Sequence, residues 1–122
     1  MINPFTVGPM ALTGFIWYQG ESNTNNQETA DAYACLFPAM ITAWRSAFGL
    51  PSAFFGFIQL STWCGEVLGI PEMREAQMEA LKLDMVGYAT NADHGAGCNI
   101  HPRKKSTAVD GSEHLLLLCS IM

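Results

Sequence analysis

Three short apolar runs alternate with two longer amphipathic segments along this chain. The runs cover residues 14–18, 53–60 and 85–89, and their β-branched and aromatic residues are typical of strands. The run 53–60 is apolar almost throughout, as expected of a parallel strand that is covered on both faces. Strands that are joined through helices pair in parallel with right-handed crossovers. The pattern therefore predicts an α/β domain with a parallel sheet.

The longer amphipathic segment is predicted to be a helix that begins near Gln27 and stops at Gly49. Its apolar residues recur at spacings of three and four, which places them on one face of a helix. These residues are Tyr33, Phe37, Met40, Ile41, Trp44 and Phe48. Pro38 lies within the segment, and it either kinks a single helix or opens a second helix at its first turn.

The shorter amphipathic segment, residues 71–83, is predicted to be a second helix. Glu72 and Glu75 lie in its first turn, where carboxylates interact favourably with the positive end of the helix dipole. The residues that mark its buried face are Met73, Gln77, Met78 and Leu81. Residues 110–122 lack such a pattern, so we place the domain within residues 1–109 and expect an unstructured tail or the product of an altered reading frame beyond it.

The composition narrows the classes of partner. Only 14% of the 122 residues are charged, against about 25% in a typical soluble domain. We therefore expect some apolar surface of this chain to be covered by another part of a longer chain or by another subunit. The net charge is −5 and residues 103–105 form the only basic cluster, so no nucleic-acid partner is expected. The longest aliphatic run, Leu115–Leu118, is far shorter than the about 20 residues that span a bilayer.

Polar residues follow the first predicted strand at once. Residues 17–23 read Trp-Tyr-Gln-Gly-Glu-Ser-Asn, so Gly20 breaks the strand and four polar side chains stand within five positions. A parallel sheet presents such residues at its carboxyl edge, where α/β enzymes bind their ligands. The stretch resembles the signature of the sialate O-acetylesterases, a branch of the SGNH hydrolases related to carbohydrate esterase family six.

The resemblance implies both a fold and a chemistry. SGNH hydrolases are three-layer α/β/α domains of flavodoxin-like type, so the chain is expected to be part of such a domain. By the same resemblance, the oxyanion- or substrate-binding residues are Gln19, Gly20, Glu21 and Asn23. Gln19 is the expected amide donor to the oxyanion, Gly20 allows the backbone to approach a ligand closely, and Glu21 binds substrate or braces the loop. Neither a metal ion nor a cofactor is implied.

A second signature follows the third predicted strand. Residues 99–105 (Asn-Ile-His-Pro-Arg-Lys-Lys) resemble the family's Ile-His-Pro turn, which makes His101 the expected general base. Many SGNH hydrolases place an aspartate three residues before this histidine, but Cys98 occupies that position here. The nearest upstream carboxylate, Asp93, is the candidate to orient the imidazole; a backbone carbonyl, in a serine–histidine dyad, is the alternative. We expect His101 and residues 19–23 to share one edge of the sheet.

The motif that carries the family's nucleophilic serine is missing from this sequence. The family takes its serine from an early strand–turn of the type Gly-Gln-Ser-Asn-Met, and no such motif occurs here; Ser22 belongs to the other signature. We therefore expect the carboxyl-side part of a catalytic domain, which needs the missing half of that domain for activity. The implied substrate is an O-acetylated sialic acid or sialoglycan. Family members are typically secreted or lysosomal, although residues 1–4 do not resemble the start of a signal peptide.

Two other classes of function stay open. One is a small metal-binding module, because zinc favours nitrogen and sulfur ligands, although the paired spacing of known zinc modules is missing. Its candidate ligands are His94, Cys98, His101, His114 and Cys119. The other is a non-enzymatic interaction module derived from a decayed esterase, which activity measurements would separate from an enzyme. The four cysteines permit two disulfides without requiring them.

Overall fold

The computed structural model describes residues 11–64, 69–93, 97–99 and 110. They contain a sheet of three parallel strands in the order β1-β2-β3. The strands are β1 (Gly14–Trp17), β2 (Phe54–Ile58) and β3 (Val86–Ala89). The connecting elements are η1 (Glu21–Asn23), α2 (Gln27–Ala47), α3 (Ile70–Met78) and η2 (Glu79–Lys82). The predicted parallel α/β fold is confirmed, and each strand lies inside the apolar run that predicted it.

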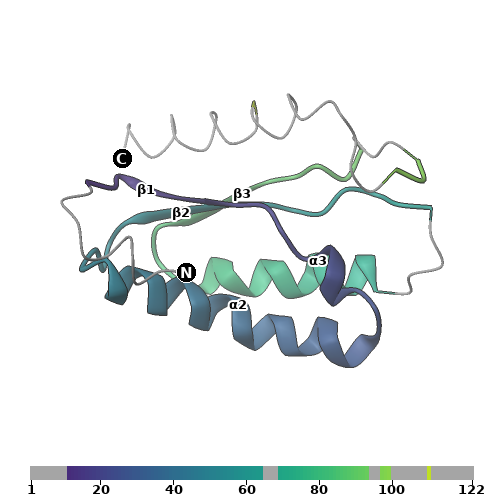
Figure 1. Cartoon of the computed structure of the whole chain (residues 1–122), viewed down its shortest axis with the longest axis horizontal. Coiled ribbons are helices and arrows are strands. Elements are labelled where there is room, and N and C mark those ends of the chain that lie inside the picture. Colours follow the sequence, from purple (N-terminus) through teal and green to yellow (C-terminus); the bar gives the residue numbers. More distant parts are fainter. Residues whose placement is uncertain (1–10, 65–68, 94–96, 100–109, 111–122) are drawn as a thin grey trace.

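Both helices lie on the same face of the sheet (Figure 1). This placement follows from the strand order, because each right-handed crossover moves one strand further in the same direction. The pairing register sets Phe15 beside Phe55 and Trp17 beside Phe57, so these four rings share the side that the helices cover. The ring centroid of Phe37 on α2 lies 6.0 Å from that of Phe55 and 5.3 Å from that of Phe57.

Local sequence signals set the ends of α2. The side chain of Asn26 accepts a hydrogen bond from the backbone N–H of Thr29 (2.8 Å) and so caps the first turn. The helix ends at Ala47, and Gly49 follows with a φ of 66°, a left-handed conformation that glycine adopts without strain. Pro38 lies inside the helix, which continues through it, so one helix spans the whole segment.

The predicted apolar stripe of α2 is confirmed as the face that packs on the sheet. Tyr33, Phe37 and Ile41 are buried in the core, and Met40 and Trp44 pack against it while partly exposed. Full burial of an apolar side chain of this size contributes about 1.5–3 kcal/mol. The stripe holds α2 in one rotational setting, which fixes the residues that meet the end of β1.

The prediction of the buried face of the second helix is confirmed within α3 but is wrong in η2, which follows it. Met73 and Gln77 are fully buried, whereas Leu81 is 38% exposed. The α-helix ends at Met78, and the chain continues as the 3₁₀ turn η2. A 3₁₀ turn has about 3.0 residues per turn instead of about 3.6, so the phase of the pattern changes and Leu81 turns toward solvent.

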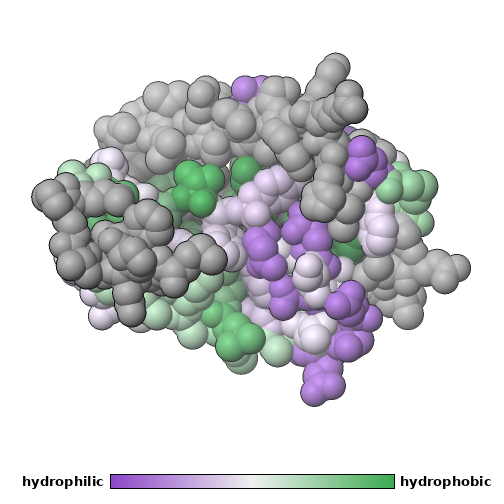
Figure 2. All heavy atoms as spheres, viewed as in Figure 1, coloured by the Kyte–Doolittle hydropathy of each residue, from purple (hydrophilic) through white to green (hydrophobic). Residues whose placement is uncertain are grey.

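The outer surface of α2 is mixed in character. Figure 2 shows hydrophilic residues gathered around the start of this helix and apolar residues exposed further along it. Leu36, near the middle of α2, is 62% exposed. Scattered exposed apolar residues are ordinary in soluble domains. In the part of the chain that the structure describes, no helix is both long and apolar enough to cross a membrane.

Candidate functional site

The peptide bond between Gln19 and Gly20, just after β1, is held from both helices. The carbonyl oxygen of Gln19 accepts hydrogen bonds from the hydroxyl of Tyr33 on α2 and from Nε2 of Gln77 on α3, both at 3.3 Å. Gln77 is fully buried, and its Oε1 also accepts a hydrogen bond from the backbone N–H of Leu60 (3.2 Å), just after β2. One buried amide therefore links the carboxyl ends of β1 and β2.

The side chain of Gln19 is fixed at both ends of its amide. Its Oε1 accepts a hydrogen bond from the hydroxyl of Tyr33 at 3.2 Å, and its Nε2 donates to Oδ1 of Asn23 at 2.9 Å. The indole N–H of Trp17 donates to the Tyr33 oxygen at 3.1 Å, which leaves the hydroxyl hydrogen to point toward Gln19. An amide nitrogen has two N–H groups, so one of them is available to a ligand at the end of β1. A fixed N–H donor of this kind is what an oxyanion site requires.

Burial keeps the Tyr33 hydroxyl protonated. Loss of contact with water raises the pKa of Tyr33 above its ordinary value of about 10. The hydrogen bond from Trp17 lowers this pKa by a smaller amount, and the nearby carboxylate of Glu21 raises it. At neutral pH Tyr33 is therefore a fixed hydrogen-bond donor to Gln19 and does not itself transfer protons.

Gly20 occupies a position that suits only glycine. Its φ of 146° is rarely adopted by residues with a side chain. A Cβ at this position would also lie 3.3 Å from Cδ1 of Leu60 and 3.5 Å from Cγ of Met73. The backbone N–H of Asn23 then donates to the carbonyl of Gly20 at 2.9 Å and closes the turn. Glycine at this position therefore lets the loop pack closely against core side chains, and the approach to a ligand that the sequence predicted stays a prediction.

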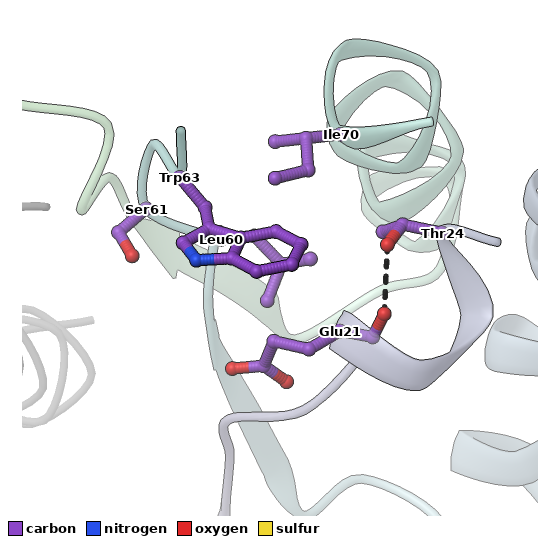
Figure 3. Close-up of a pocket in the computed structure, with 6 residues that line it drawn as sticks. All are labelled: Glu21, Thr24, Leu60, Ser61, Trp63 and Ile70. Carbon is purple, nitrogen blue, oxygen red and sulfur yellow. Dashed lines mark hydrogen bonds between the residues drawn. The ribbon is translucent and has the colours of Figure 1, made fainter. Parts of the chain in front are cut away.

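A pocket opens on the side of η1 that faces the end of β2 (Figure 3). Its cavity volume is only about 10 Å³, room for about one water molecule. The residues that line it are Glu21, Thr24, Leu60, Ser61, Trp63 and Ile70. The hydroxyl of Thr24 donates to the carbonyl of Glu21 at 2.7 Å, the bond that is dashed in Figure 3. Glu21 therefore lines a pocket, while Gln19 and Asn23 bond to each other within the same loop.

The loop after β3 reaches back to the end of β1. Nδ2 of Asn91 donates a hydrogen bond to the hydroxyl of Tyr18 at 2.9 Å, and Asn91 is buried. Asp93, the candidate to orient the histidine, lies in an exposed turn two residues later. His101 is outside the described residues, so its place on this edge of the sheet stays a prediction.

Three polar residues of this site were not predicted to have a role from the sequence: Tyr33, Gln77 and Asn91. For Tyr33 and Gln77 the available signal was a polar atom on an otherwise apolar helix face, where burial demands a hydrogen-bond partner. For Asn91 it was a short polar side chain close behind a predicted strand. In each case the pattern showed the position but not the partner.

A disulfide bond joins the loops that follow β2 and β3. Cys64 is bonded to Cys98, and their Cα atoms are 4.9 Å apart. Beside it, the indole N–H of Trp63 donates to the carbonyl of Cys98 at 3.1 Å, and the backbone N–H of Cys64 donates to the carbonyl of Gly97 at 3.3 Å. The loop that precedes the predicted base is therefore anchored to the end of β2.

This disulfide corrects the hypothesis of a metal-binding module. A zinc ligand must be a thiolate, and the bonded sulfur of Cys98 is not one. The other candidate ligands, His94, His101, His114 and Cys119, lie outside the described residues. Within the described ranges, no group of three or more His, Cys, Asp or Glu side chains is placed to hold a metal ion.

Comparison with known proteins decides the family. The family described as carbohydrate esterase, sialic acid-specific acetylesterase matches residues 4–114 of the chain. The chain belongs to this family. The sialate O-acetylesterase of Rattus norvegicus is 43% identical over 84 residues, which cover 61% of this chain and 15% of that protein. The sialate O-acetylesterase of Homo sapiens is 45% identical over 69 residues, which cover 51% of this chain and 12% of that protein.

Solved structures give the same result for the fold of this acetylesterase-family chain. A carbohydrate acetylesterase from Xanthomonas citri matches with a TM-score of 0.75 and 33% identity, over 88% of this chain and 24% of that one. A protein from Arabidopsis thaliana that is 24% identical matches with a TM-score of 0.63, over 90% of this chain and 44% of that one, and so shares the fold. The chain spans only 12–15% of the length of the rat and human relatives.

In this member of the acetylesterase family, one loop gathers most of the predicted site residues. Gln19, Gly20, Glu21 and Asn23 all lie between β1 and α2. Ser22 is in the same turn and exposed. Asp93 belongs to the loop after β3, which the bond between Asn91 and Tyr18 ties to the end of β1.

Proposed function

We propose that this chain forms part of the active site of a sialate O-acetylesterase, which hydrolyses an acetyl ester on a hydroxyl group of a sialic acid. The observation that supports it, beside the family match, is the amide of Gln19, held by Tyr33 and Asn23 at the carboxyl edge of the sheet. Ester hydrolysis places negative charge on a carbonyl oxygen in the transition state, and a fixed N–H donor stabilises that charge.

The proposed reaction uses His101 as the general base. A serine hydroxyl from outside these 122 residues attacks the acetyl carbonyl while His101 takes its proton. The sugar oxygen leaves with that proton, and the acetyl group stays on the serine. Water, deprotonated by the same imidazole, then releases acetate and restores the serine. Asp93 orients the imidazole in this proposal, and a backbone carbonyl is the alternative.

The test is a chimera in which this chain replaces the matching segment of the rat sialate O-acetylesterase. We expect the chimera to release acetate from an O-acetylated sialic acid. His101→Ala should lower kcat by about 10²–10⁴-fold, because the general base is lost. Gln19→Ala should lower kcat by about 10²–10³-fold, because one oxyanion donor is lost. His114→Ala is the matched control and should leave kcat unchanged.

The chain by itself should release no acetate above the uncatalysed rate, because a general base needs a nucleophile to act on and the family's serine motif does not occur in these 122 residues. A folded chimera without activity would refute the proposed function. Turnover by the chain alone that disappears in His101→Ala would refute the external serine, and the exposed Ser22 would then be the next residue to substitute. Far-ultraviolet circular dichroism establishes that each protein is folded.

The disulfide supports a secreted or lysosomal location for the proposed enzyme. Disulfides form and persist mainly in oxidising compartments, and they are rare in the reducing cytosol. The bond between Cys64 and Cys98 agrees with that setting.

A further inference from the structure

The disulfide between Cys64 and Cys98 holds the loop after β3 at a second point. This loop leaves the sheet at Ala89, the last residue of β3, and is bonded at Cys98 to the loop after β2. Two hydrogen bonds accompany the disulfide: the indole N–H of Trp63 donates to the carbonyl of Cys98, and the backbone N–H of Cys64 donates to the carbonyl of Gly97. Trp63, Cys64, Gly97 and Cys98 therefore form one junction between the two loops.

The junction shortens the chain that connects the proposed base to a fixed point. His101 is three residues beyond Cys98, and three residues span at most about 11 Å. The buried Asn91, which is hydrogen-bonded to Tyr18, is ten residues before His101. Ten residues reach up to about 35 Å, so the chain from Asn91 constrains the imidazole far less than the disulfide does.

The same junction is tied to the group that is proposed to bind the oxyanion. Cys64 is four residues beyond Leu60, whose backbone N–H donates to Oε1 of Gln77. Nε2 of Gln77 donates in turn to the carbonyl of Gln19. The disulfide thus fixes the loop that precedes His101 relative to the strand end that holds Gln19. This matters because both groups have to act on one acetyl ester at the same time.

The disulfide is open to reductants. Both Cys64 and Cys98 are exposed. Exposed disulfides have more oxidising potentials than buried structural ones, and they are the bonds that act as labile or regulatory links. The hydrogen bond from Trp63 to the carbonyl of Cys98 is also exposed, so water competes for both groups. Reduction therefore removes the one link of this junction that water cannot replace.

We propose that the disulfide between Cys64 and Cys98 positions His101, so that the esterase is active only while this bond is oxidised; the inference rests on the function proposed above. Reduction takes two electrons and two protons from a dithiol. The sulfur–sulfur bond breaks, Cys64 and Cys98 become thiols, and the dithiol closes to its own disulfide. The imidazole is then less often within hydrogen-bond reach of the nucleophile. Activity is thereby restricted to oxidising compartments.

The test uses the chimera with the rat sialate O-acetylesterase, assayed for acetate release with and without dithiothreitol. Reduction should lower kcat about tenfold to a hundredfold and leave KM unchanged, because a small misplacement of a catalytic group slows the chemical step without weakening substrate binding. Replacement of dithiothreitol by oxidised glutathione should restore kcat. Mass spectrometry of alkylated thiols shows whether the loss and the recovery follow the redox state of Cys64 and Cys98.

Two variants separate this disulfide from the other cysteines of the chimera. Replacing both Cys64 and Cys98 with serine should give the low kcat without reductant, and dithiothreitol should lower it no further. Cys35→Ser is the matched control, since Cys35 is exposed and not bonded; it should keep the wild-type kcat and the full response to dithiothreitol. All assays are run below the melting temperature of the reduced protein, which circular dichroism measures.

A His101→Ala background distinguishes positioning of the base from a general loss of structure. Reduction should not lower the residual kcat of His101→Ala, because the two changes remove the same contribution to catalysis. In the chain alone, reduction should also speed the exchange of the Trp63 indole N–H with solvent, because its hydrogen bond to Cys98 then has no covalent link beside it.

Three results would overturn the positioning role. These are an unchanged kcat after both serine substitutions, an equal fractional loss of kcat in the His101→Ala background, or indole exchange that reduction does not alter. The esterase function is read separately, from the oxidised chimera. A folded, oxidised chimera that releases no acetate refutes the function and this inference with it, whereas an active chimera that reduction leaves unaffected refutes the inference alone.

Discussion

Tyr33 shows how much one hydroxyl group contributes to this site. Tyr33→Phe keeps the ring in the core but removes the donor to Gln19 and the acceptor for the indole N–H of Trp17. We expect the free energy of unfolding to fall by about 1–3 kcal/mol, because partly buried polar groups lose their partner. Urea denaturation measures the change. Tyr88→Phe is the control, since Tyr88 is 40% exposed, and an equal loss in both variants would contradict the role of Tyr33.

The same hydroxyl predicts how stability changes at high pH. Burial raises the pKa of Tyr33 in the folded protein above its value of about 10 in the unfolded chain, so the folded state binds the proton more tightly. This contribution to stability is complete below about pH 10, and it is lost as the pH rises through the folded-state pKa. Above about pH 10 the wild-type free energy of unfolding should therefore fall more steeply than that of Tyr33→Phe. Parallel curves would show that Tyr33 does not titrate differently in the two states.

At the residue scale, the sequence predicted the polar loop after β1 but not the residues that hold it in place. Gln19, Gly20 and Asn23 were singled out because residues 17–23 resemble a family signature, since an apolar run followed by polar residues is also typical of an ordinary loop. Helical periodicity correctly placed Tyr33 and Gln77 on buried faces, but it records burial and not the direction of a polar tip. Their partners lie far along the chain, and only the packed structure brings them together.

At the scale of elements, three strands and two helices followed from hydrophobic spacing, because each apolar run and stripe has one buried side. The burial of Arg45 was not predicted by hydrophobic spacing, because a charged residue on a helix is normally taken as solvent-exposed. It is 7% exposed, and its guanidinium donates to the carbonyls of Ala53, Asp84 and Met85, each at 2.9 Å. Burial lowers the pKa of Arg45, and the nearby Asp84 opposes this shift. Arg45 thus ties α2 to the beginnings of β2 and β3.

Gln77 is the corresponding link at the other end of the strands, and its removal is a test of the packing of α3. Gln77→Leu keeps a similar side-chain volume but removes two hydrogen bonds. The backbone N–H of Leu60 loses its acceptor, and the carbonyl of Gln19 loses one of its donors. We expect a loss of about 2–4 kcal/mol in the free energy of unfolding, because buried backbone groups lose partners. Amide hydrogen exchange at Leu60 should become faster in this variant.

The control for this prediction is Gln27→Leu, since Gln27 is exposed and its hydrogen bond to Asp31 lies on the surface of α2. This variant should change the free energy of unfolding by less than about 0.5 kcal/mol. Unaltered exchange at Leu60 in Gln77→Leu would show that the amide does not hold the end of β2.

At the scale of the whole molecule, the candidate site depends on segments that the sequence alone could not connect. Cys64 and Cys98 are 34 residues apart, and with four cysteines the spacing permitted several pairings. The structure joins the loops after β2 and β3, and the bond between Asn91 and Tyr18 joins β3 to β1. All three strand ends are therefore linked at the carboxyl edge of the sheet, where we propose the active site.

The disulfide supplies the last prediction. Replacing both Cys64 and Cys98 with serine should lower the free energy of unfolding by about 3–4 kcal/mol, because the unfolded chain regains the freedom of a long closed loop. Cys35→Ser is the matched control, since Cys35 is exposed and not bonded, and it should leave the free energy of unfolding unchanged. Denaturation midpoints that match the wild type after both substitutions would mean that hydrogen bonds alone hold these loops together.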